Sequence, residues 1–333
     1  MPALTEPAQI GKRELLADFI SIADAKEKPL LAMLPKSRNL TNMLMQWQAD
    51  AYASPVLSGV ADGKDVGEFE NAGANRALIK NYCQKVRRTA MVGDIAENVS
   101  DVAGAKSGEL ARAVDKKLEE LSRDIEAVLG SDNDAVEETS SSTPYQTRGL
   151  GTWIKATAGT TLPVPSAFLT PSASIDSTAM ASLTQSTFKG VLKSIFTQHG
   201  KSQNLTLVCG TALKETITGF TQYQGSSTNT WGTIRAFNDK LDGGKITDSI
   251  TAFEGDFNTV VIHPSLLLAN NTTNAPTRRG YVLAMDMLEL RWNRMPRVKP
   301  LQDEGGGPRA LVDAIFGLVY KNPLVGGKFA ATS

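Results

Sequence analysis

The chain has 333 residues, of which 41% are hydrophobic and 21% charged. These proportions are typical of a globular protein and exclude a disordered or fibrous chain. Lys plus Arg and Asp plus Glu both number 35, so the chain lacks the overall positive charge with which a dedicated nucleic-acid-binding protein displaces counterions. The length predicts one elaborate domain or two closely packed ones.

Cysteine content and hydropathy indicate the compartment. The two cysteines, Cys83 and Cys209, form no C-x-x-C motif and no Cys/His cluster, which argues against a disulfide framework. Residues 1–10 lack the cationic and then apolar pattern of a signal peptide. The longest apolar stretch, residues 310–320, is interrupted by Asp313 and is shorter than the roughly 20 residues that span a bilayer. We therefore expect a soluble protein of a reducing cytoplasm, with no membrane partner.

Two elements are predicted in the first 50 residues. Within residues 13–34, a short helix is indicated by the apolar side chains Leu15, Leu16, Phe19, Ile20 and Ile22. Pro29 should end that helix. In residues 43–49 apolar and polar positions alternate, with Met43, Met45, Trp47 and Ala49 on one side and Gln46 and Gln48 on the other. Such alternation predicts a half-buried strand.

A long two-stranded hairpin with a flexible tip is expected next. Residues 54–73 are rich in Gly, Asp and Ser, and residues 75–92 are extended in pattern. Cations interrupt both alternation sets of the return strand, namely Lys80, Lys85, Arg87 and Arg88. A hairpin without a clean hydrophobic face needs a partner to be stable.

The strongest predicted element is a helix over residues 107–129. Its apolar stripe consists of Leu110, Val114, Leu118, Leu121, Ile125 and Val128, spaced by three or four residues. Ser107 can cap the start and Gly130 the end. The helix would be about 34 Å long. Its other face carries Arg112, Asp115, Lys116, Lys117, Glu119, Glu120 and Arg123, and the simplest interpretation of that face is a solvated surface.

The middle of the chain predicts a compact α+β unit. An acidic, then Ser/Thr-rich loop at residues 131–143 forms a plausible boundary. A helix is expected over residues 183–198 with Gly200 as terminator, followed by a strand at 205–209 and a helix at 211–218. Strands are then expected at 245–253 and 258–263.

Strands return in the last region. They are expected at residues 281–285 and 287–292, followed by a turn at 305–308 and a last long segment at 309–320. We find no internal repeat.

Phosphate-binding motifs are weak. Gly200-Lys201-Ser202 resembles the end of a phosphate loop, but Ile195 stands where the first glycine is required, and the triplet precedes a strand rather than a helix. Gly305-Gly306-Gly307 lacks the following helix and the spacing of a dinucleotide site. We predict no cofactor.

The two histidines do not indicate a metal or a catalytic site. Neither His199 nor His263 has carboxylates or cysteines at ligand spacing. His199 is expected in the last turn of a helix, where a cation is favoured, and His263 as a packed strand residue. A Ser/His/Asp triad remains open, although no G-x-S-x-G motif supports one. We therefore predict no catalytic residue and no metal ligand.

One basic run contains aromatic or thioether side chains. It comprises Arg291, Arg294, Arg297 and Lys299, interleaved with Trp292 and Met295. The run could contact nucleic acid, but a cross-subunit salt-bridge strip or a solvated strand face is the favoured interpretation.

Five segments stand in a distinctive order along the chain: EKPLLAMLPKS (27–37), TNMLMQWQADAY (41–52), NRALIKNYCQKVRRTAMVGD (75–94), ELARAVDKKLEELSRDIEAVLGSD (109–132) and RGLGTWI (148–154). In this order they resemble the HK97-fold major capsid proteins of tailed bacteriophages, in a branch often described as an uncharacterised phage capsid family. The resemblance implies an α+β fold with an N-terminal arm, an E-loop hairpin, a long spine helix, and peripheral and axial domains.

The resemblance also implies a division of the chain. Residues 1–38 would be the arm, 39–106 the E-loop hairpin with flanking strands, and 107–150 the peripheral domain with the spine helix. Residues 151–279 would be the axial domain and 280–333 the strands that complete the peripheral domain. The E-loop itself would span residues 50–88. Its polar character would follow if its buried face belongs to the next subunit.

The implied function is a major capsid protein, a non-enzymatic subunit that assembles into pentamers and hexamers of an icosahedral head. Expected partners are other copies of the chain, portal, scaffolding and cement or decoration proteins, and packaged double-stranded DNA through weak non-specific contact. The expected location is the virion, with assembly in the host bacterial cytoplasm. The near-zero net charge suits dense self-association.

Candidate inter-subunit contacts are Lys80, Arg87, Arg88, Glu119 and Glu120. We expect the three cations of the hairpin to pair with acidic residues of a neighbour, such as those of its spine helix. Some relatives join subunits through a lysine–asparagine bond, and Lys64 lies near the presumed tip, but no partner is indicated. Others carry a fused N-terminal scaffolding segment of about a hundred residues, for which this sequence has no room, so a separate scaffold or none is expected.

Three other functions stay open. The first is an encapsulin-like nanocompartment shell with the same fold, which genomic neighbours would distinguish. The second is a soluble nucleic-acid-binding protein, which would depend on the basic run around Arg291 alone. An enzyme is the weakest alternative because no nucleotide, metal or nucleophile motif is found.

Overall fold

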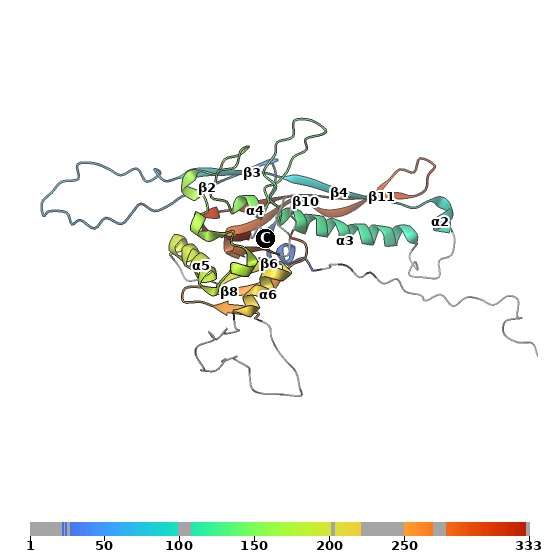
Figure 1. Cartoon of the computed structure of the whole chain (residues 1–333). Coiled ribbons are helices and arrows are strands. Elements are labelled where there is room, and N and C mark those ends of the chain that lie inside the picture. The colour runs from blue at the N-terminus through green and yellow to red at the C-terminus, as the bar shows by residue number, and fades with distance from the viewer. Residues whose placement is uncertain are drawn as a thin grey trace, which may run out of the picture. The chain divides into compact units, whose positions relative to one another are not determined.

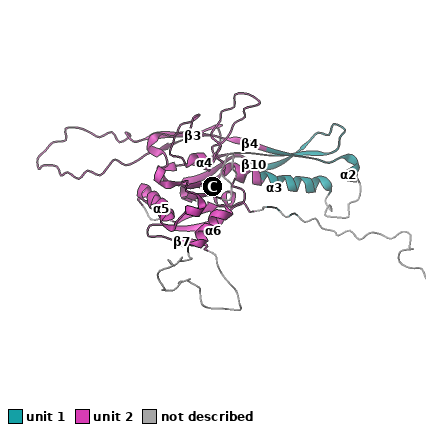
Figure 2. Ribbon diagram, viewed as in Figure 1, with its two compact units in different colours: residues 1–25, 87–121, 296–313 teal, residues 26–86, 122–295, 314–333 magenta. Residues whose placement is uncertain are grey.

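The structure is a computed structural model that describes residues 22, 24, 27–98, 108–200, 204–220, 250–268 and 278–330. The chain divides into two compact units (Figure 2). Unit 1 comprises residues 1–25, 87–121 and 296–313, and unit 2 comprises residues 26–86, 122–295 and 314–333. No helix in the described part of the chain is long and apolar enough to span a membrane.

A six-stranded mixed sheet forms the centre of unit 2 (Figure 1). Its order is β5 (Ile175–Asp176), β12 (Gly327–Ala330), β9 (Arg279–Leu283), β6 (Asn204–Cys209), β8 (Thr259–Pro264) and β7 (Ala252–Glu254). Strand β6 pairs in parallel with β8 and antiparallel with β9. The predicted strands at 205–209 and 258–263 are confirmed within one residue. Strand β9 begins two residues before the predicted 281, and of the predicted strand at 245–253 residues 245–249 lie outside the described residues.

Two helices pack against this sheet, α5 (Gln185–His199) and α6 (Thr211–Gly219). Thr184 caps α5 by accepting a hydrogen bond from the backbone N–H of Thr187 at 3.2 Å, and Gly200 ends it with φ of 67°. A positive φ is accessible to glycine at little cost. Phe188 is fully buried and stacks on Phe329 at a ring-centroid distance of 5.3 Å. The predicted helices at 183–198 and 211–218 are thus confirmed.

A four-stranded sheet has the order β1 (Lys36–Ser37), β10 (Leu288–Leu301), β11 (Arg309–Tyr320) and β4 (Gln84–Met91). The predicted segment at 309–320 is confirmed as a strand. The predicted strand at 287–292 is too short, because β10 continues to Leu301. The apolar alternation stops near Trp292, where the strand becomes exposed, while backbone pairing in the sheet continues through the basic residues.

A separate hairpin joins β2 (Leu44–Ala49) to β3 (Ala77–Tyr82), with Trp47 opposite Ile79. Met45 and Ala49 are buried and Gln46 is exposed, as the alternation predicts. The expectation of one continuous return strand over residues 75–92 is wrong. The strand breaks at Cys83, so that β3 pairs with β2 and β4 belongs to the four-stranded sheet. The two-stranded part is correspondingly short, and residues 51–76 form no strand.

The long helix α3 spans Glu109–Leu129. Of the predicted apolar stripe, Leu121 and Ile125 are fully buried, and Leu110, Val114, Leu118 and Val128 are half-buried. Ser107 lies outside the described residues. Gly130 follows the last residue, as expected, but its φ is not positive. An added Cβ there would lie 3.1 Å from Leu268 Cδ2, a close contact that the leucine side chain would have to relieve by a small shift.

Pro29 begins a helix instead of ending one. Helix α1 spans Pro29–Met33 with proline at its first position, where the missing N–H would have no intrahelical partner in any case. Most of the helix predicted within residues 13–34 lies outside the described residues. Two further short helices, α2 (Asp94–Asn98) and α4 (Leu150–Trp153), have no sequence-based prediction. The remaining helical turns are η2 (Ser166–Phe168), η3 (Ser172–Ser174), η4 (Met180–Ser182), η6 (Met285–Met287) and η7 (Pro323–Val325).

Candidate functional site: an exposed loop and the polar network at its base

The most exposed part of unit 2 is residues 51–76, which we call the long loop. It connects β2 to β3 (Figure 1), and every one of its residues is exposed. Six of its large apolar side chains have exposed fractions between 73% and 103%: Tyr52, Val56, Leu57, Val60, Val66 and Phe69. Exposed apolar side chains in such number on one segment make it a candidate for contact with another molecule.

Polar contacts join the two ends of the long loop at its base, and a turn reverses the chain at its tip. Arg76 Nε lies 3.2 Å from Asp50 Oδ2, and Asn75 Nδ2 donates to the carbonyl of Ala51 at 3.2 Å. At the tip, the N–H of Lys64 donates to Ala61 O at 3.2 Å, and Gly63 has φ of 75°. The position of both ends is therefore fixed by the hairpin below them.

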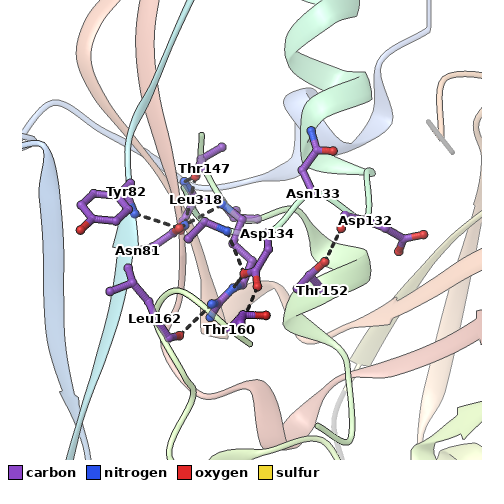
Figure 3. A network of polar contacts seen from close by, with 12 residues as sticks. Asn81, Tyr82, Asp132, Asn133, Asp134, Thr147, Thr152, Thr160, Leu162 and Leu318 are labelled. Carbon is purple, nitrogen blue, oxygen red and sulfur yellow. Dashed lines mark hydrogen bonds and ion pairs between the residues drawn. The ribbon is translucent and has the colours of Figure 1, made fainter. Parts of the chain in front are cut away.

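Asn81 ties that hairpin to the rest of unit 2 (Figure 3). Its Nδ2 donates to Thr147 Oγ1 at 3.0 Å and to Leu318 O at 2.7 Å. Its Oδ1 accepts from the backbone N–H of Tyr82 at 2.9 Å and of Arg148 at 3.0 Å. The side chain of this fully buried asparagine thus uses both donors and both acceptor positions. Because the amide contacts β11 and the segment at 147–148, it holds β3 in one place.

Arg148 continues the network. Its guanidinium is fully buried and donates from Nε to Asp134 Oδ1 at 2.7 Å and from Nη2 to Leu162 O at 2.7 Å. Asp134 also accepts from the N–H of Thr160 at 3.2 Å. The guanidinium carbon lies 4.7 Å from the ring centroid of Trp153, a cation–π contact. The buried charge is therefore compensated on several sides.

A second buried cluster forms around Asp132. Its carboxylate contacts Nη2 of the fully buried Arg279, and Lys328 Nζ donates to Asp132 Oδ1 at 3.1 Å and to Gly151 O at 2.9 Å. Burial lowers the pKa of Lys328, while the charge of Asp132 acts in the opposite direction. Tyr281 donates to Gly130 O at 2.8 Å, and burial raises its pKa. Asp132 thereby joins β9 and β12 to the segment that follows α3.

These two clusters explain why the segment RGLGTWI (148–154) contains glycine at positions 149 and 151. A Cβ at Gly149 would collide with Ser131 O, and one at Gly151 would collide with the Asp132 carboxylate. Thr152 Oγ1 donates to Asp132 O at 2.5 Å. The glycines allow the segment to pass directly against residues 131–132, which places Arg148 and Trp153 in the core.

Glu126 is a buried residue that the sequence analysis missed. It lies on α3 and accepts hydrogen bonds from the N–H groups of Leu30 at 3.0 Å and Leu31 at 2.7 Å. Its carboxylate therefore caps the start of α1 from another part of the chain. Burial raises its pKa, and the two N–H groups oppose that shift. One feature of the sequence indicates that Glu126 is buried: it lies three residues before Leu129, and therefore on the same side of the helix as that buried leucine.

The five predicted contact residues do not form one cluster. Arg88 Nη1 lies 3.9 Å from Glu120 Oε2 of the same chain. Lys117 Nζ donates to Glu120 at 2.7 Å, a bond that lowers the pKa of Glu120. Lys80 is half-buried opposite Gln46 on β2, whereas Arg87 and Glu119 are exposed. Within the chain, the structure places Arg88 and Glu120 of this set close to each other.

The basic run on β10 is divided between the two faces of the strand. Arg291, Arg297 and Lys299 alternate with Arg294, which therefore lies on the opposite face. Arg291 pairs with Glu289 at 3.1 Å, and Arg297 pairs with Asp313 at 2.9 Å. Arg291 and Arg297 are thus already neutralised by neighbours.

Cysteines and histidines occupy structural positions. Cys83 and Cys209 are buried and free, and burial raises their pKa to about 11 and about 12. His199 lies in the last turn of α5, as predicted, and His263 is half-buried in β8. Among the described residues, no group of three His, Cys, Asp or Glu side chains is arranged to hold a metal ion.

The fold and the family were compared with known proteins. A model of the SU10 major capsid protein family matches residues 4–333. The chain is similar in structure to the capsid asymmetric unit of cyanophage A-1(L), with a TM-score of 0.64, 14% identity and 99% of both chains covered. It is also similar to a chain of Mycobacterium phage Bobi, with a TM-score of 0.61, 10% identity, and 97% of this chain and 96% of that chain covered.

A third similar structure is the capsid of Myoviridae phage XM1, with a TM-score of 0.53, 10% identity and 96% of both chains covered. No curated protein sequence matches the chain. The likeness to these structures identifies an HK97-type fold, as the sequence resemblance implies. Because the family match covers nearly the whole chain, the protein belongs to the SU10 major capsid protein family and is a structural subunit of a phage capsid, assembled from many copies and located in the virion.

Proposed function

We propose that the long loop is the segment with which each subunit contacts its neighbours, and that these contacts build the shell. The observation that carries this proposal is the set of six exposed apolar side chains between β2 and β3. Their burial against another copy would remove apolar surface from water, at about 25 cal/mol per Å². The fully satisfied Asn81 supports the proposal, because it fixes the hairpin from which the loop extends.

The regions of the chain would then have separate tasks. Residues 1–38 serve as an arm, 39–106 as the E-loop hairpin with flanking strands, and 107–150 as the peripheral region with the spine helix. Residues 151–279 surround the ring axis, and 280–333 complete the peripheral region. The likeness of the fold to phage capsid chains supports this division.

The assembled shell would be an icosahedral head of pentamers and hexamers that encloses double-stranded DNA. Heterologous contacts that close into rings are a standard route to such shells. Portal, scaffolding and cement or decoration proteins would be further partners, and assembly would take place in the cytoplasm of the bacterial host. The protein would act without catalysis, and its function would be distributed over its contact surfaces.

Among the candidate contact charges, Arg87 fits an inter-subunit role better than Arg88. Arg87 is exposed, whereas Arg88 already lies near Glu120 of its own chain. Lys80, Glu119 and Glu120 remain candidates for contacts with neighbours. Exposed ion pairs are weak individually, so these contacts would determine the register of assembly more than its strength.

Electron microscopy of the purified protein, alone and with the products of its neighbouring genes, tests the proposed function. Closed shells or capsomer rings are the expected result for the wild type. A variant with Val56, Leu57 and Phe69 replaced by Ser should stay unassembled, since the apolar surface of the long loop is reduced. A matched variant with Ser54, Ser58 and Ala61 replaced by Gly should still assemble. Normal shells from the first variant would contradict the role of the loop.

A further inference from the structure

The short helix α1 has no cap of its own for its first backbone N–H groups. Lys28, the residue before the helix, makes no side-chain capping bond, and Pro29 at the first position has no N–H. The next two N–H groups, of Leu30 and Leu31, therefore need an acceptor from elsewhere. A helix of five residues is also too short to persist without tertiary contacts. The formation of α1 thus depends on what it packs against.

Glu126 of α3 supplies the missing acceptor. Its Oε1 accepts from the N–H of Leu30 at 3.0 Å, and its Oε2 accepts from the N–H of Leu31 at 2.7 Å. An N-cap side chain makes bonds of this kind from the position directly before a helix, whereas here the acceptor lies 96 and 95 residues away along the chain. Hydrogen bonds to a carboxylate are stronger than those to a neutral acceptor, and negative charge is favoured at a helix N-terminus. The contact therefore joins α1 firmly to α3.

The segment that begins with α1 is held at its other end by β10. Leu290 N donates to Pro35 O at 2.8 Å, and β1 pairs in parallel with β10. Between these two attachments, Leu30 and Leu34 are 0% and 2% exposed, and their spacing of four residues puts them on one face of the chain. We call residues 28–37 the strap. Both of its attachments lie within unit 2.

The attachment at Glu126 fixes a direction as well as a position. Two neighbouring N–H groups contact the two oxygens of one carboxylate, and a two-point contact restricts rotation that a single hydrogen bond would allow. The carboxylate is itself fully buried, so its own rotation is restricted by packing. It acts at the end of the strap that the chain enters from residues 1–27. The orientation of α1 is therefore referred to α3.

We infer that Glu126 is a positioning residue for the N-terminal segment: by orienting α1, it determines the direction in which residues 1–27 leave unit 2. This inference rests on the proposed function, in which residues 1–38 serve as an arm between subunits. An arm with a fixed direction reaches its contact at a lower entropic cost than one that must be ordered during assembly. Glu126 thus influences assembly without contacting a neighbouring subunit.

The competing explanation is that Glu126 is only a helix cap. Two variants separate the two roles. Glu126→Leu removes both acceptor oxygens. The double variant Glu126→Leu/Lys28→Ser adds a residue that is favoured at the N-cap position, and so restores a cap without restoring the attachment to α3. If Glu126 is only a cap, the double variant should behave like the wild type in every measurement.

Hydrogen exchange on the full-length, unassembled subunit checks that the variants act as designed. In Glu126→Leu, the N–H groups of Leu30 and Leu31 should exchange faster by about tenfold or more, because two charge-assisted bonds are lost. In the double variant their exchange should return toward the wild-type rate. Unchanged exchange in Glu126→Leu would overturn the inference, since the carboxylate would then not hold α1.

Pulsed electron paramagnetic resonance then measures the direction of the strap. Spin labels are attached to cysteines introduced at Glu27 and Lys193, which are both exposed, while the native cysteines are buried. The wild type should give one narrow distribution of distances between the labels. Glu126→Leu should give a broad one, and the double variant should stay broad although its helix is capped. A narrow distribution in the double variant would overturn the inference and leave Glu126 as a cap.

Particle yield by electron microscopy connects the direction of the strap to assembly. Glu126→Leu and the double variant should both lower the yield by about tenfold. Thr170→Val is the matched control for lost stability, because it removes the buried hydrogen bond from Thr170 Oγ1 to Pro323 O, 2.7 Å long, in another part of unit 2. It should assemble like the wild type. Recovery of yield in the double variant, or an equal loss in Thr170→Val, would overturn the inference.

Deletion of residues 1–26 tests the proposed role of the arm separately. Normal shells from this deletion would reject the arm as an assembly element, and with it that part of the proposed function. The distance distributions would still decide whether Glu126 orients the strap, because they are measured on unassembled subunits. The failure of the inference and the failure of the proposed function are thus distinguishable.

Discussion

The long loop and the network at its base distribute polar and apolar groups in opposite ways. The loop exposes Tyr52, Leu57 and Phe69 to solvent, while the network at its base and the neighbouring Asp132 cluster bury Asn81, Arg148 and Arg279 completely. Apolar groups in water and charges in the core are both unfavourable for an isolated subunit. In the network, hydrogen bonds and ion pairs within the chain offset most of this cost, although Arg148 Nη1 has no hydrogen-bond partner among the described residues. In the loop, the apolar side chains remain in contact with water. If the loop acts in assembly as proposed, stability and assembly depend on different residues.

Removal of the Asp132 carboxylate should have the largest effect on stability. In Asp132→Ala, the fully buried Arg279 and the largely buried Lys328 lose the carboxylate that they share, and the free energy of unfolding should fall by about 3–5 kcal/mol. Urea denaturation of the unassembled subunit measures this change. Asp62→Ala, on the exposed loop, is the matched control and should change stability by less than about 0.5 kcal/mol. Equal effects of the two substitutions would refute the contrast between loop and network.

Asn81→Leu should have a smaller but clear effect. The leucine is close in size but leaves the buried groups that Asn81 bonds, including Thr147 Oγ1 and Arg148 N, with fewer partners. We expect a loss of about 1–3 kcal/mol, measured by the same denaturation. Asn75→Leu, at the exposed base of the loop, is the control. A neutral Asn81→Leu would show that the hairpin is held by packing alone.

Glu126 predicts a pH dependence. Because burial raises its pKa in the folded state above the ordinary value of 4.5, the folded chain binds its proton more tightly than the unfolded chain does. Its contribution to stability is then greatest at low pH and declines as pH rises through the raised value. The stability of the wild type relative to Glu126→Gln should therefore increase as pH falls from about 7.5 to about 5. A constant difference across this range would contradict the shift.

The smallest effect on stability is expected in the long loop. Replacing Val56, Leu57 and Phe69 by Ser should leave the free energy of unfolding of the subunit within about 0.5 kcal/mol of the wild type, because these side chains are exposed. Denaturation of the unassembled variant measures this value beside the assembly assay. A destabilisation of several kcal/mol would mean that the loop packs on its own subunit.

Periodicity in the sequence predicted the regular elements well. The stripe of α3, the alternation of β2 and the glycine at the end of α5 all depend on local patterns of burial, and each is present in the structure. The break at Cys83 and the extension of β10 to Leu301 were not predictable, since they depend on which strand pairs with which. Pro29 shows the same limit, because a proline can begin a helix as well as end one.

The long loop and the polar network at its base were predicted less completely than the helices and strands. The Gly-, Asp- and Ser-rich composition of residues 54–73 predicted a flexible hairpin tip, and it gave no indication that the apolar side chains among them are exposed. Buried polar partners such as Asn81 and Leu318 are separated by 237 residues, so no local pattern connects them. The segment RGLGTWI was noticed for its resemblance to a family, and its physical reason became clear only from the close approach of Gly149 and Gly151 to residues 131–132.

The burial of both cysteines has a practical consequence for labelling. With pKa values raised to about 11 and about 12, Cys83 and Cys209 are almost entirely protonated at neutral pH, and thiols in this state react slowly with maleimides. The two native cysteines should therefore contribute little to maleimide labelling of the chain. A cysteine introduced at Asp65 would be the fast-reacting thiol of the free subunit, and the fall in its labelling rate on assembly would report directly how completely the loop is covered in the finished particle.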